Sequence, residues 1–235
     1  MKIFAGSNLA ASAGFAMLAL VATPVHASIS FDLNAANISN TGPYATVTVN
    51  RTDATHATIT FQSLSNGGNV YNFGGQGAVA VNVNATGWTI GSFTQTNTGV
   101  GFTPGPLSDA GAGNENGFGI FNQTVDSFDG YTHSSTNISF VLTNTGGTWA
   151  NDAAVLIQNN PINQAVAAAH IFVCADVIAG AGIGCDASGT ASVTGYAAGS
   201  GGSSPPTEIP EPNSASIALL ALGLLGAGFW TRRKS

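Results

Sequence analysis

Short segments in which apolar residues alternate with threonine or asparagine recur along the middle of the chain and limit the folds that it can adopt. Ala45–Val49 alternates apolar residues with threonine, and Val79–Val83 alternates valine with Ala80 and Asn82. Successive side chains of a strand point to opposite faces of its sheet, so a period of two indicates strands with one buried face. The segments predicted as strands are Ser30–Leu33, Ala45–Val49, Thr58–Phe61, Asn69–Phe73, Val79–Val83, Thr89–Phe93, Phe118–Phe121, Asn137–Leu142, Ala167–Val173 and Ala191–Tyr196.

Turn signals separate these segments. Asn66-Gly67-Gly68 and Asp129-Gly130 are typical of tight turns between strands. About ten short strands joined in this way predict an all-β fold, an antiparallel β-sandwich that is jelly-roll-like. One short helix is expected at Trp149–Gln158, before Asn159-Asn160-Pro161 stops it. The Gly- and Pro-rich stretch Thr98–Asn116 is expected to be a long loop.

The composition of the segment from Ser28 to about Pro206 fits one acidic β domain. The segment contains eight aspartates and Glu115, whereas Arg51 is its only basic residue apart from histidine. Such a surface repels nucleic acid and anionic lipid and attracts divalent cations. Its Gly, Asn, Thr, Ser and Val content favours strands and polar turns, and its apolar content is too high for a disordered chain. We assign residues 28–196 to the sandwich and residues 197–208, rich in Gly, Ser and Pro, to a flexible linker.

The N-terminus has the features of a signal peptide. Met1-Lys2 is a short positive start, and Leu9–Val25 is a run of apolar and small residues. Val25-His26-Ala27 fits a small-residue cleavage site, so residues 1–27 are predicted to be removed and the mature chain to begin at Ser28. Export through the Sec translocon and cleavage by signal peptidase follow from this assignment.

The C-terminus combines a rigid motif, an apolar span and a basic end. Pro210 and Pro212 fix their own φ and push the residues before them into extended geometry, so 209–212 forms an extended strip around the anion of Glu211. Residues 214–230 are uncharged and, as a helix, would span roughly 25 Å, the lower limit for crossing a bilayer. The basic tail 231–235, with Arg232, Arg233 and Lys234, predicts a cytoplasmic C-terminus.

This tail resembles the PEP-CTERM sorting signal of exported proteins in Gram-negative bacteria. The matching parts are Pro210-Glu211-Pro212, the apolar span and Arg232-Arg233-Lys234, in that order, in about the last tenth of the chain. The resemblance implies exosortase, a membrane-embedded cysteine transpeptidase, as the processing partner. The chain would be anchored transiently in the inner membrane and cut near the motif, and its domain would reach the cell surface or the extracellular polysaccharide matrix. A plain C-terminal anchor would explain the span and the cations but not Pro-Glu-Pro.

Two cysteines, Cys174 and Cys185, are present in the chain. In an exported protein a disulfide is expected, and closing this short loop would contribute roughly 3 kcal/mol on the chain-entropy model. The alternative is a buried thiol, because Cys174 continues the apolar run Ile171–Val173.

No catalytic signature is found, and no catalytic residue is predicted. Neither His-Glu-x-x-His nor Gly-x-Ser-x-Gly occurs, and the remaining histidines, His56, His133 and His170, share no metal-ligand spacing. A glycosidase needs two carboxylates. Glu115 could supply one of them, with a second from Asp126, Asp129, Asp152 or Asp176, but nothing in the sequence brings them together.

Two clusters of oxygen-bearing side chains could hold Ca²⁺, the one metal or cofactor that the sequence suggests. Hard oxygen ligands on Gly-rich loops suit this ion. The candidate ligands are Asp109, Asn114, Glu115 and Asn116 in the first cluster, and Asp126 and Asp129 in the second. Asx residues also dominate ordinary solvated turns, and this interpretation without a metal is the simpler one.

We therefore expect a non-catalytic surface or matrix protein, with a structural or adhesive role in a biofilm and exopolysaccharide as a partner. The alternatives are a carbohydrate-binding or carbohydrate-active sandwich, or an ice-binding protein. Thr-x-Thr pairs such as Thr46/Thr48 and Thr58/Thr60 motivate the ice-binding alternative, although threonine also suits the wet face of any strand. Two carboxylates in a cleft, one with a raised pKa, would favour an enzyme, and a smooth convex sandwich would favour the structural role.

Overall fold

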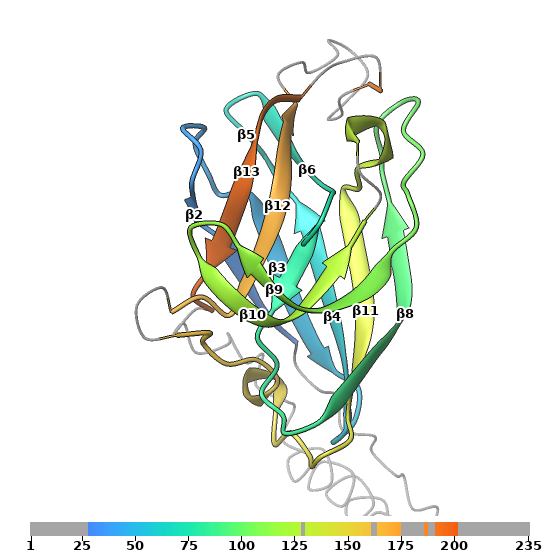
Figure 1. Cartoon of the computed structure of the whole chain (residues 1–235), viewed down its shortest axis with the longest axis vertical. Helices are drawn as coiled ribbons and strands as arrows, with labels where there is room; N and C mark the ends of the chain where they lie inside the picture. Colours follow the sequence, from blue (N-terminus) through green and yellow to red (C-terminus); the bar gives the residue numbers. More distant parts are fainter. Residues whose placement is uncertain (1–27, 128–129, 161–163, 175–185, 188–190, 202–235) are drawn as a thin grey trace, which may run out of the picture. The chain divides into compact units, whose positions relative to one another are not determined.

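The computed structural model describes residues 28–127, 130–160, 164–174, 186–187 and 191–201 (Figure 1). These residues belong to one unit, His26–Ile209. The predicted signal peptide, most of the linker, the Pro-Glu-Pro motif and the apolar span 214–230 lie outside them. Within the described ranges no helix combines the length and hydropathy needed to cross a bilayer.

Sheet A is a five-stranded antiparallel sheet in the order β1-β3-β4-β11-β8. Along each strand apolar residues face inward and alternate with polar residues that face outward, as in the buried pattern of β3 and β4. Its strands are β1 (Ile29–Leu33), β3 (Ala45–Arg51), β4 (His56–Ser63), β8 (Trp88–Thr96) and β11 (Asn137–Asn144).

Sheet B has eight strands, with β2-β13-β12-β7-β10-β9 as its main order, β6 beside β12 and β5 beside β6. β12 pairs with β13 along one edge, and with β7 and β6 in succession along the other. Its strands are β2 (Ala35–Ala36), β5 (Ser65–Asn66), β6 (Asn69–Phe73), β7 (Val79–Val81), β9 (Ser108–Glu115), β10 (Gly119–Asp126), β12 (Ala167–Cys174) and β13 (Ala191–Gly199).

The two sheets pack face to face around one hydrophobic core. Phe61 of sheet A meets Phe73 of sheet B edge-on, with ring centroids 6.3 Å apart, and it also stacks on Phe140 of its own sheet. Aromatic pairs of this kind add about 0.5–1.5 kcal/mol beyond the area that they bury. The sandwich is therefore held by inward side chains of both sheets.

β12 is buried on both faces because a hairpin covers the outer face of sheet B. Ala167 and Ala169 point into the main core, whereas Ala168 packs with Phe121 and Ala198 in a second, smaller cluster. Phe121 belongs to the hairpin β9–β10, which crosses in front of β13 and β12 in Figure 1. Register shifts along β10 bend this hairpin, and the alanines beneath it leave room for the extra layer.

Every segment predicted as a strand falls on a strand, and the prediction of an all-β fold of antiparallel sheets is confirmed. The strand order differs from the two Greek keys of a jelly roll. β3–β4, β9–β10 and β12–β13 are hairpins that each stay within one sheet.

The predicted loop Thr98–Asn116 and the predicted helix Trp149–Gln158 are corrected. β9 forms at Ser108–Glu115 because β10 supplies its ladder. The helix reduces to one 3₁₀ turn, Asp152–Ala154, which is capped by the Asn151 side chain. The residues that follow are drawn into extended pairing, with Leu156 bridged to Val83.

The end of the domain also differs from the predicted boundary. β13 continues to Gly199, so its last three residues, Ala197–Gly199, lie in the segment that we predicted to be linker.

A second 3₁₀ turn, Tyr131–His133, precedes β11.

Replacing Ala168 by leucine should destabilise the domain by about 1–3 kcal/mol, because the added atoms would overpack the contact with Phe121. Ala150→Leu, at an exposed position, is the matched control and should change stability by less than about 0.5 kcal/mol. Denaturant unfolding monitored by circular dichroism measures both variants. Equal stability of the two variants would contradict the packed hairpin.

Candidate functional site

The hairpin buries a carboxylic acid against sheet B. Glu115 ends β9 and is 1% exposed. Its Oε1 lies so close to Gly77 that a Cβ at residue 77 would collide with it, and Gly77 has a φ of +61°. Only glycine combines this backbone conformation with such a close approach. Residue 77 is therefore fixed as glycine by the position of Glu115.

A pocket of about 330 Å³ opens beside this contact, and we call it the Glu115 pocket. It is lined by β9, by the end of β10, by the turn at Gly77 before β7 and by Tyr196 of β13. Its lining residues are Gln76, Gly77, Ala110, Ala112, Gly113, Asn114, Glu115, Thr124, Asp126 and Tyr196.

A second carboxylate shares the pocket. Asp126 ends β10, and its Oδ1 accepts a hydrogen bond of 2.8 Å from the N–H of Gly77. Gly77 therefore contacts both carboxyl groups. Burial raises the pKa of Glu115 to about 8, and repulsion from the Asp126 carboxylate adds to this shift. Burial, and then the charge of Glu115, also raise the pKa of Tyr196. At neutral pH the protein therefore holds Glu115 largely in its protonated form.

The carboxyl group of Glu115 is not fully satisfied within the protein. Its Oε2 is buried and has no hydrogen-bond partner. Leaving a buried polar atom unpaired costs about 1–3 kcal/mol, and such atoms are rare in folded proteins. The wall of the pocket thus contains a carboxyl oxygen whose hydrogen-bonding capacity is unused.

The structure brings together only part of the predicted metal-ligand set. Asn114, Glu115 and Asp126 line the Glu115 pocket. Asp109 lies elsewhere on the hairpin, where its Oδ1 accepts hydrogen bonds from Gly111 N and Gln123 Nε2. Asn116 turns its backbone carbonyl to the side chain of Asn37. Asp129 lies outside the described residues, among which no three Asp, Glu, His or Cys side chains converge on one point.

The three histidines within the described residues do not converge either. His56 Nδ1 lies 2.9 Å from Asp53 Oδ2, and His133 Nδ1 donates to the carbonyl of Thr103. His170 stacks on Tyr196, with ring centroids 4.7 Å apart and an interplanar angle of 18°. His170 therefore packs behind Tyr196, which lines the Glu115 pocket. The position of His170 in an apolar strand gave no indication of this role.

Cys174 is buried and accepts a hydrogen bond of 3.0 Å from the hydroxyl of Tyr131. Cys185 lies outside the described residues. The Cys174–Cys185 disulfide stays a prediction.

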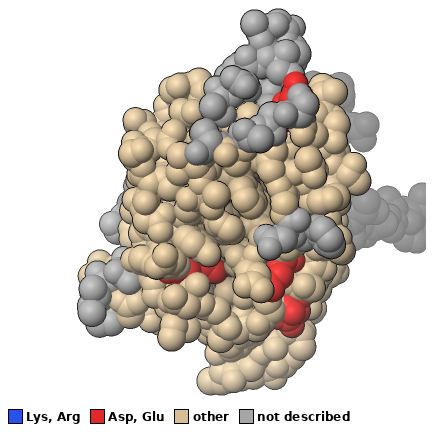
Figure 2. All heavy atoms as spheres, turned by 45° about the horizontal axis from the view of Figure 1, so that its top comes forward, with Lys and Arg blue, Asp and Glu red and all other residues tan. Residues whose placement is uncertain are grey.

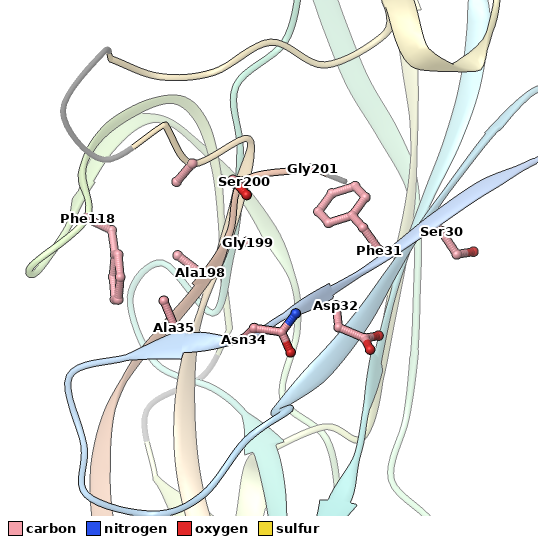
Figure 3. Close-up of a pocket in the computed structure, with 11 residues that line it drawn as sticks. Ser30, Phe31, Asp32, Asn34, Ala35, Phe118, Ala198, Gly199, Ser200 and Gly201 are labelled. Atoms are coloured by element: carbon pink, nitrogen blue, oxygen red, sulfur yellow. The ribbon is translucent and has the colours of Figure 1, made fainter. Parts of the chain in front are cut away.

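A second pocket, of about 400 Å³, lies where the chain passes from β1 of sheet A to β2 of sheet B. We call it the Phe31 pocket. In Figure 3 the rings of Phe31 and Phe118 stand on opposite sides, with the polar atoms of Asn34 and Ser200 between them and the Asp32 carboxylate at the edge below Phe31. The pocket therefore combines two aromatic walls with a few polar groups, as ligand sites commonly do.

The outer face of sheet A carries hydroxyl and amide side chains in register across all five strands. The first rank contains Ser30, Thr48, Thr60, Ser139 and Thr94. The second contains Asp32, Thr46, Gln62, Asn137 and Thr96. We call these two ranks the hydroxyl face. Asp32 is its only charged member, and Ser30 and Asp32 also line the Phe31 pocket.

Hydrogen bonds between neighbours order these side chains. Ser30 Oγ lies 2.8 Å from Thr48 Oγ1, and Thr60 Oγ1 lies 3.0 Å from Ser139 Oγ. In the view of Figure 2, acidic side chains form small red areas on a surface that is otherwise uncharged, and no described Lys or Arg is visible. The described surface is thus sparsely charged in that view.

The stability of the domain should fall as pH rises from about 4.5 to about 8. In this window the folded protein keeps the Glu115 proton that the unfolded chain releases, so each pH unit lowers stability by up to roughly 1.4 kcal/mol. Glu115→Gln should remove this slope, because an amide mimics the protonated acid. Urea unfolding at several pH values, in a metal chelator, measures it. The same slope in both proteins would contradict the buried acid.

Comparison with known proteins identifies the C-terminal segment. No curated protein and no solved structure is significantly similar to the chain. The family described as PEP-CTERM protein-sorting motif matches residues 208–234, which include Pro210-Glu211-Pro212, the apolar span and Arg232-Arg233-Lys234. The chain therefore carries a PEP-CTERM protein-sorting motif, the signal of exported proteins that exosortase processes.

Proposed function

We propose that the β domain is a non-catalytic adhesive module that binds extracellular polysaccharide after sorting to the cell surface or the biofilm matrix. The observation that carries this proposal is the hydroxyl face, two ranks of short polar side chains in register across sheet A. The sorting motif at 208–234 supports delivery to the place where such polymers accumulate.

The hydroxyl face suits a neutral, hydroxyl-rich polymer. Adjacent strands lie about 4.8 Å apart, so the face repeats donors and acceptors at a regular short spacing. Serine and threonine lose little side-chain entropy on binding, and a face with one charge needs little desolvation of ions. Each contact is weak, but an extended polymer can use many of them together.

The Phe31 pocket extends this face at its edge. Ser30 and Asp32 belong to the ranks and also line the pocket, whereas the Phe31 ring points to the other side of β1. A polymer on the ranks can therefore reach the space between Phe31 and Phe118 by bending over this edge strand. The apolar faces of sugar rings pack well on aromatic side chains, while their hydroxyls bond to groups such as Asp32 and Asn34. The pocket thereby offers an anchor for one or two sugar units.

Exosortase processing should depend on the Pro-Glu-Pro strip. In the producing strain, the double change Pro210→Ala and Pro212→Ala should leave the chain uncut and in the membrane fraction, because the segment loses its fixed extended geometry. Cell fractionation with mass spectrometry of peptides across residues 205–215 measures this, and a strain without exosortase should show the same defect. Thr207→Ala is the control beside the motif. Release of the double variant at the wild-type level would contradict the assignment.

Removing hydroxyl groups from the centre of the hydroxyl face should weaken polysaccharide binding. Thr48→Val with Thr60→Val keeps the shape and the strand preference but deletes two hydrogen-bonding groups, so affinity should fall roughly tenfold. Cosedimentation of the processed protein with polysaccharide from the producing strain, and with cellulose, measures this. Thr148→Val, at an exposed position outside the face, should bind like the wild type.

Two outcomes of this experiment would overturn the proposal. Unchanged binding by the double valine variant would remove the hydroxyl face from the interaction. Absence of binding together with a freezing hysteresis that the double variant loses would assign the face to ice, since ranked threonines can also order water.

The Glu115–Asp126 pair favours a second candidate, a carbohydrate-active enzyme. A carboxyl group with a raised pKa beside a second carboxylate is the pattern of a glycosidase acid and its partner. The low exposure of Glu115 weighs against it, because a sugar ring must reach the acid. Release of reducing ends from the same polysaccharides, lost in Glu115→Gln, would favour this candidate over the adhesive one.

A further inference from the structure

The Glu115 pocket contains a group that polysaccharide binding on sheet A leaves unused. Oε2 of Glu115 is buried without a hydrogen-bond partner in a residue that is 1% exposed. A carboxylate oxygen can be satisfied by a hydrogen-bond donor or by a cation. The lining of the pocket decides between these two.

The described lining of the pocket supplies negative charge and no positive charge. The ionisable side chains that line it are Glu115, Asp126 and Tyr196, with His170 stacked behind the tyrosine ring. Two carboxyl groups that both contact Gly77 repel each other when both are ionised. A divalent cation between them removes this repulsion and satisfies the unpaired oxygen of Glu115.

Size also favours an ion. The carboxyl group lies against the backbone of Gly77 with no room for one added carbon atom on that side. A sugar ring cannot approach a group that is so enclosed, whereas a single ion with its waters fits within about 330 Å³. Asn114 lines the same pocket, so its amide oxygen is available as a further hard ligand.

We propose that the Glu115 pocket binds Ca²⁺ through the carboxylate oxygens of Glu115 and Asp126, and that the ion links the turn end of the β9–β10 hairpin, at Glu115, to its open end, at Asp126. Ca²⁺ accepts carboxylate, amide and water oxygens in irregular arrangements, whereas Mg²⁺ demands a near-ideal octahedron. With two carboxylates, the affinity should lie in the range of extracellular Ca²⁺ modules, about 0.1–1 mM. The proposal does not depend on the polysaccharide assignment, since it concerns the opposite sheet.

Thermal unfolding of the processed protein tests the site. At pH 7.5, after treatment with a chelator, 5 mM Ca²⁺ should raise Tm by several degrees, and 5 mM Mg²⁺ should raise it much less. Glu115→Gln and Asp126→Asn should each abolish the Ca²⁺ shift. Both changes preserve shape, and the amide oxygen introduced by Asp126→Asn can still accept the hydrogen bond from Gly77. The control, Asp53→Asn, removes an equal charge from an exposed turn and should keep the full shift.

Equal shifts with Ca²⁺ and Mg²⁺, or a Ca²⁺ shift that persists in both pocket variants, would overturn the proposal. Circular dichroism establishes that each variant is folded. If one variant does not fold, the other gives the same comparison. A Tm that Ca²⁺ leaves unchanged would mean that protonation alone neutralises Glu115.

Terbium luminescence gives an independent readout of the position of the ion. Tb³⁺ replaces Ca²⁺ and emits when a nearby tyrosine transfers energy to it, and Tyr196 lines the pocket. Tyr196→Phe should remove most of the sensitised emission while keeping the Ca²⁺ shift in Tm, because the hydroxyl group is not a proposed ligand. Emission that survives in Tyr196→Phe and in Glu115→Gln would place the ion elsewhere.

Discussion

The close packing of alanines on both faces of β12 is the constraint on which the rest of the domain depends. Ala167 and Ala169 face the main core, and Ala168 faces the hairpin, so one strand serves two interfaces. Small side chains let a third layer approach sheet B closely. Because the hairpin lies so near, Glu115 is buried against Gly77 and loses its water. Both the architecture and the chemistry of the pocket follow from this packing.

The sequence predicts those parts of the fold where side-chain pattern and tertiary packing agree. Ala45–Val49 and Asn137–Leu142 alternate between core and solvent as their period of two indicates. Ser108–Glu115 has no such pattern and few β-forming residues, and it becomes a strand only because β10 pairs with it. Whether such a segment becomes a strand depends on its pairing with another segment. The local residue pattern carries no information about that pairing.

The candidate sites also combine features that the sequence predicts with features that only the fold creates. The Thr-x-Thr pairs indicate a wet face, but only the pairing of five strands aligns them into ranks. The sequence marks Glu115 as a candidate ligand, yet its meeting with Asp126 depends on the bend of β10 and on Gly77 in the turn before β7. The close contact of Gly77 with Glu115, which lies far away in the sequence, cannot be predicted from the sequence alone.

The covering hairpin gives the domain two levels of stability. The sandwich core holds the sheets together through rings such as Phe61 and Phe73, and Val125 and the pairing with β7 tie the end of β10 to it. The turn end of the hairpin rests on the small Phe121 cluster and on the buried acid Glu115. Segments with little apolar contact open first in folded proteins. Lifting only the turn end of the hairpin, from Glu115 to Phe121, would expose Phe121 and the alanine face, while Val125 of β10 stays in the core. Amide hydrogen exchange in β9 would therefore report the free energy of local opening, whereas exchange in β3 would report the free energy of global unfolding.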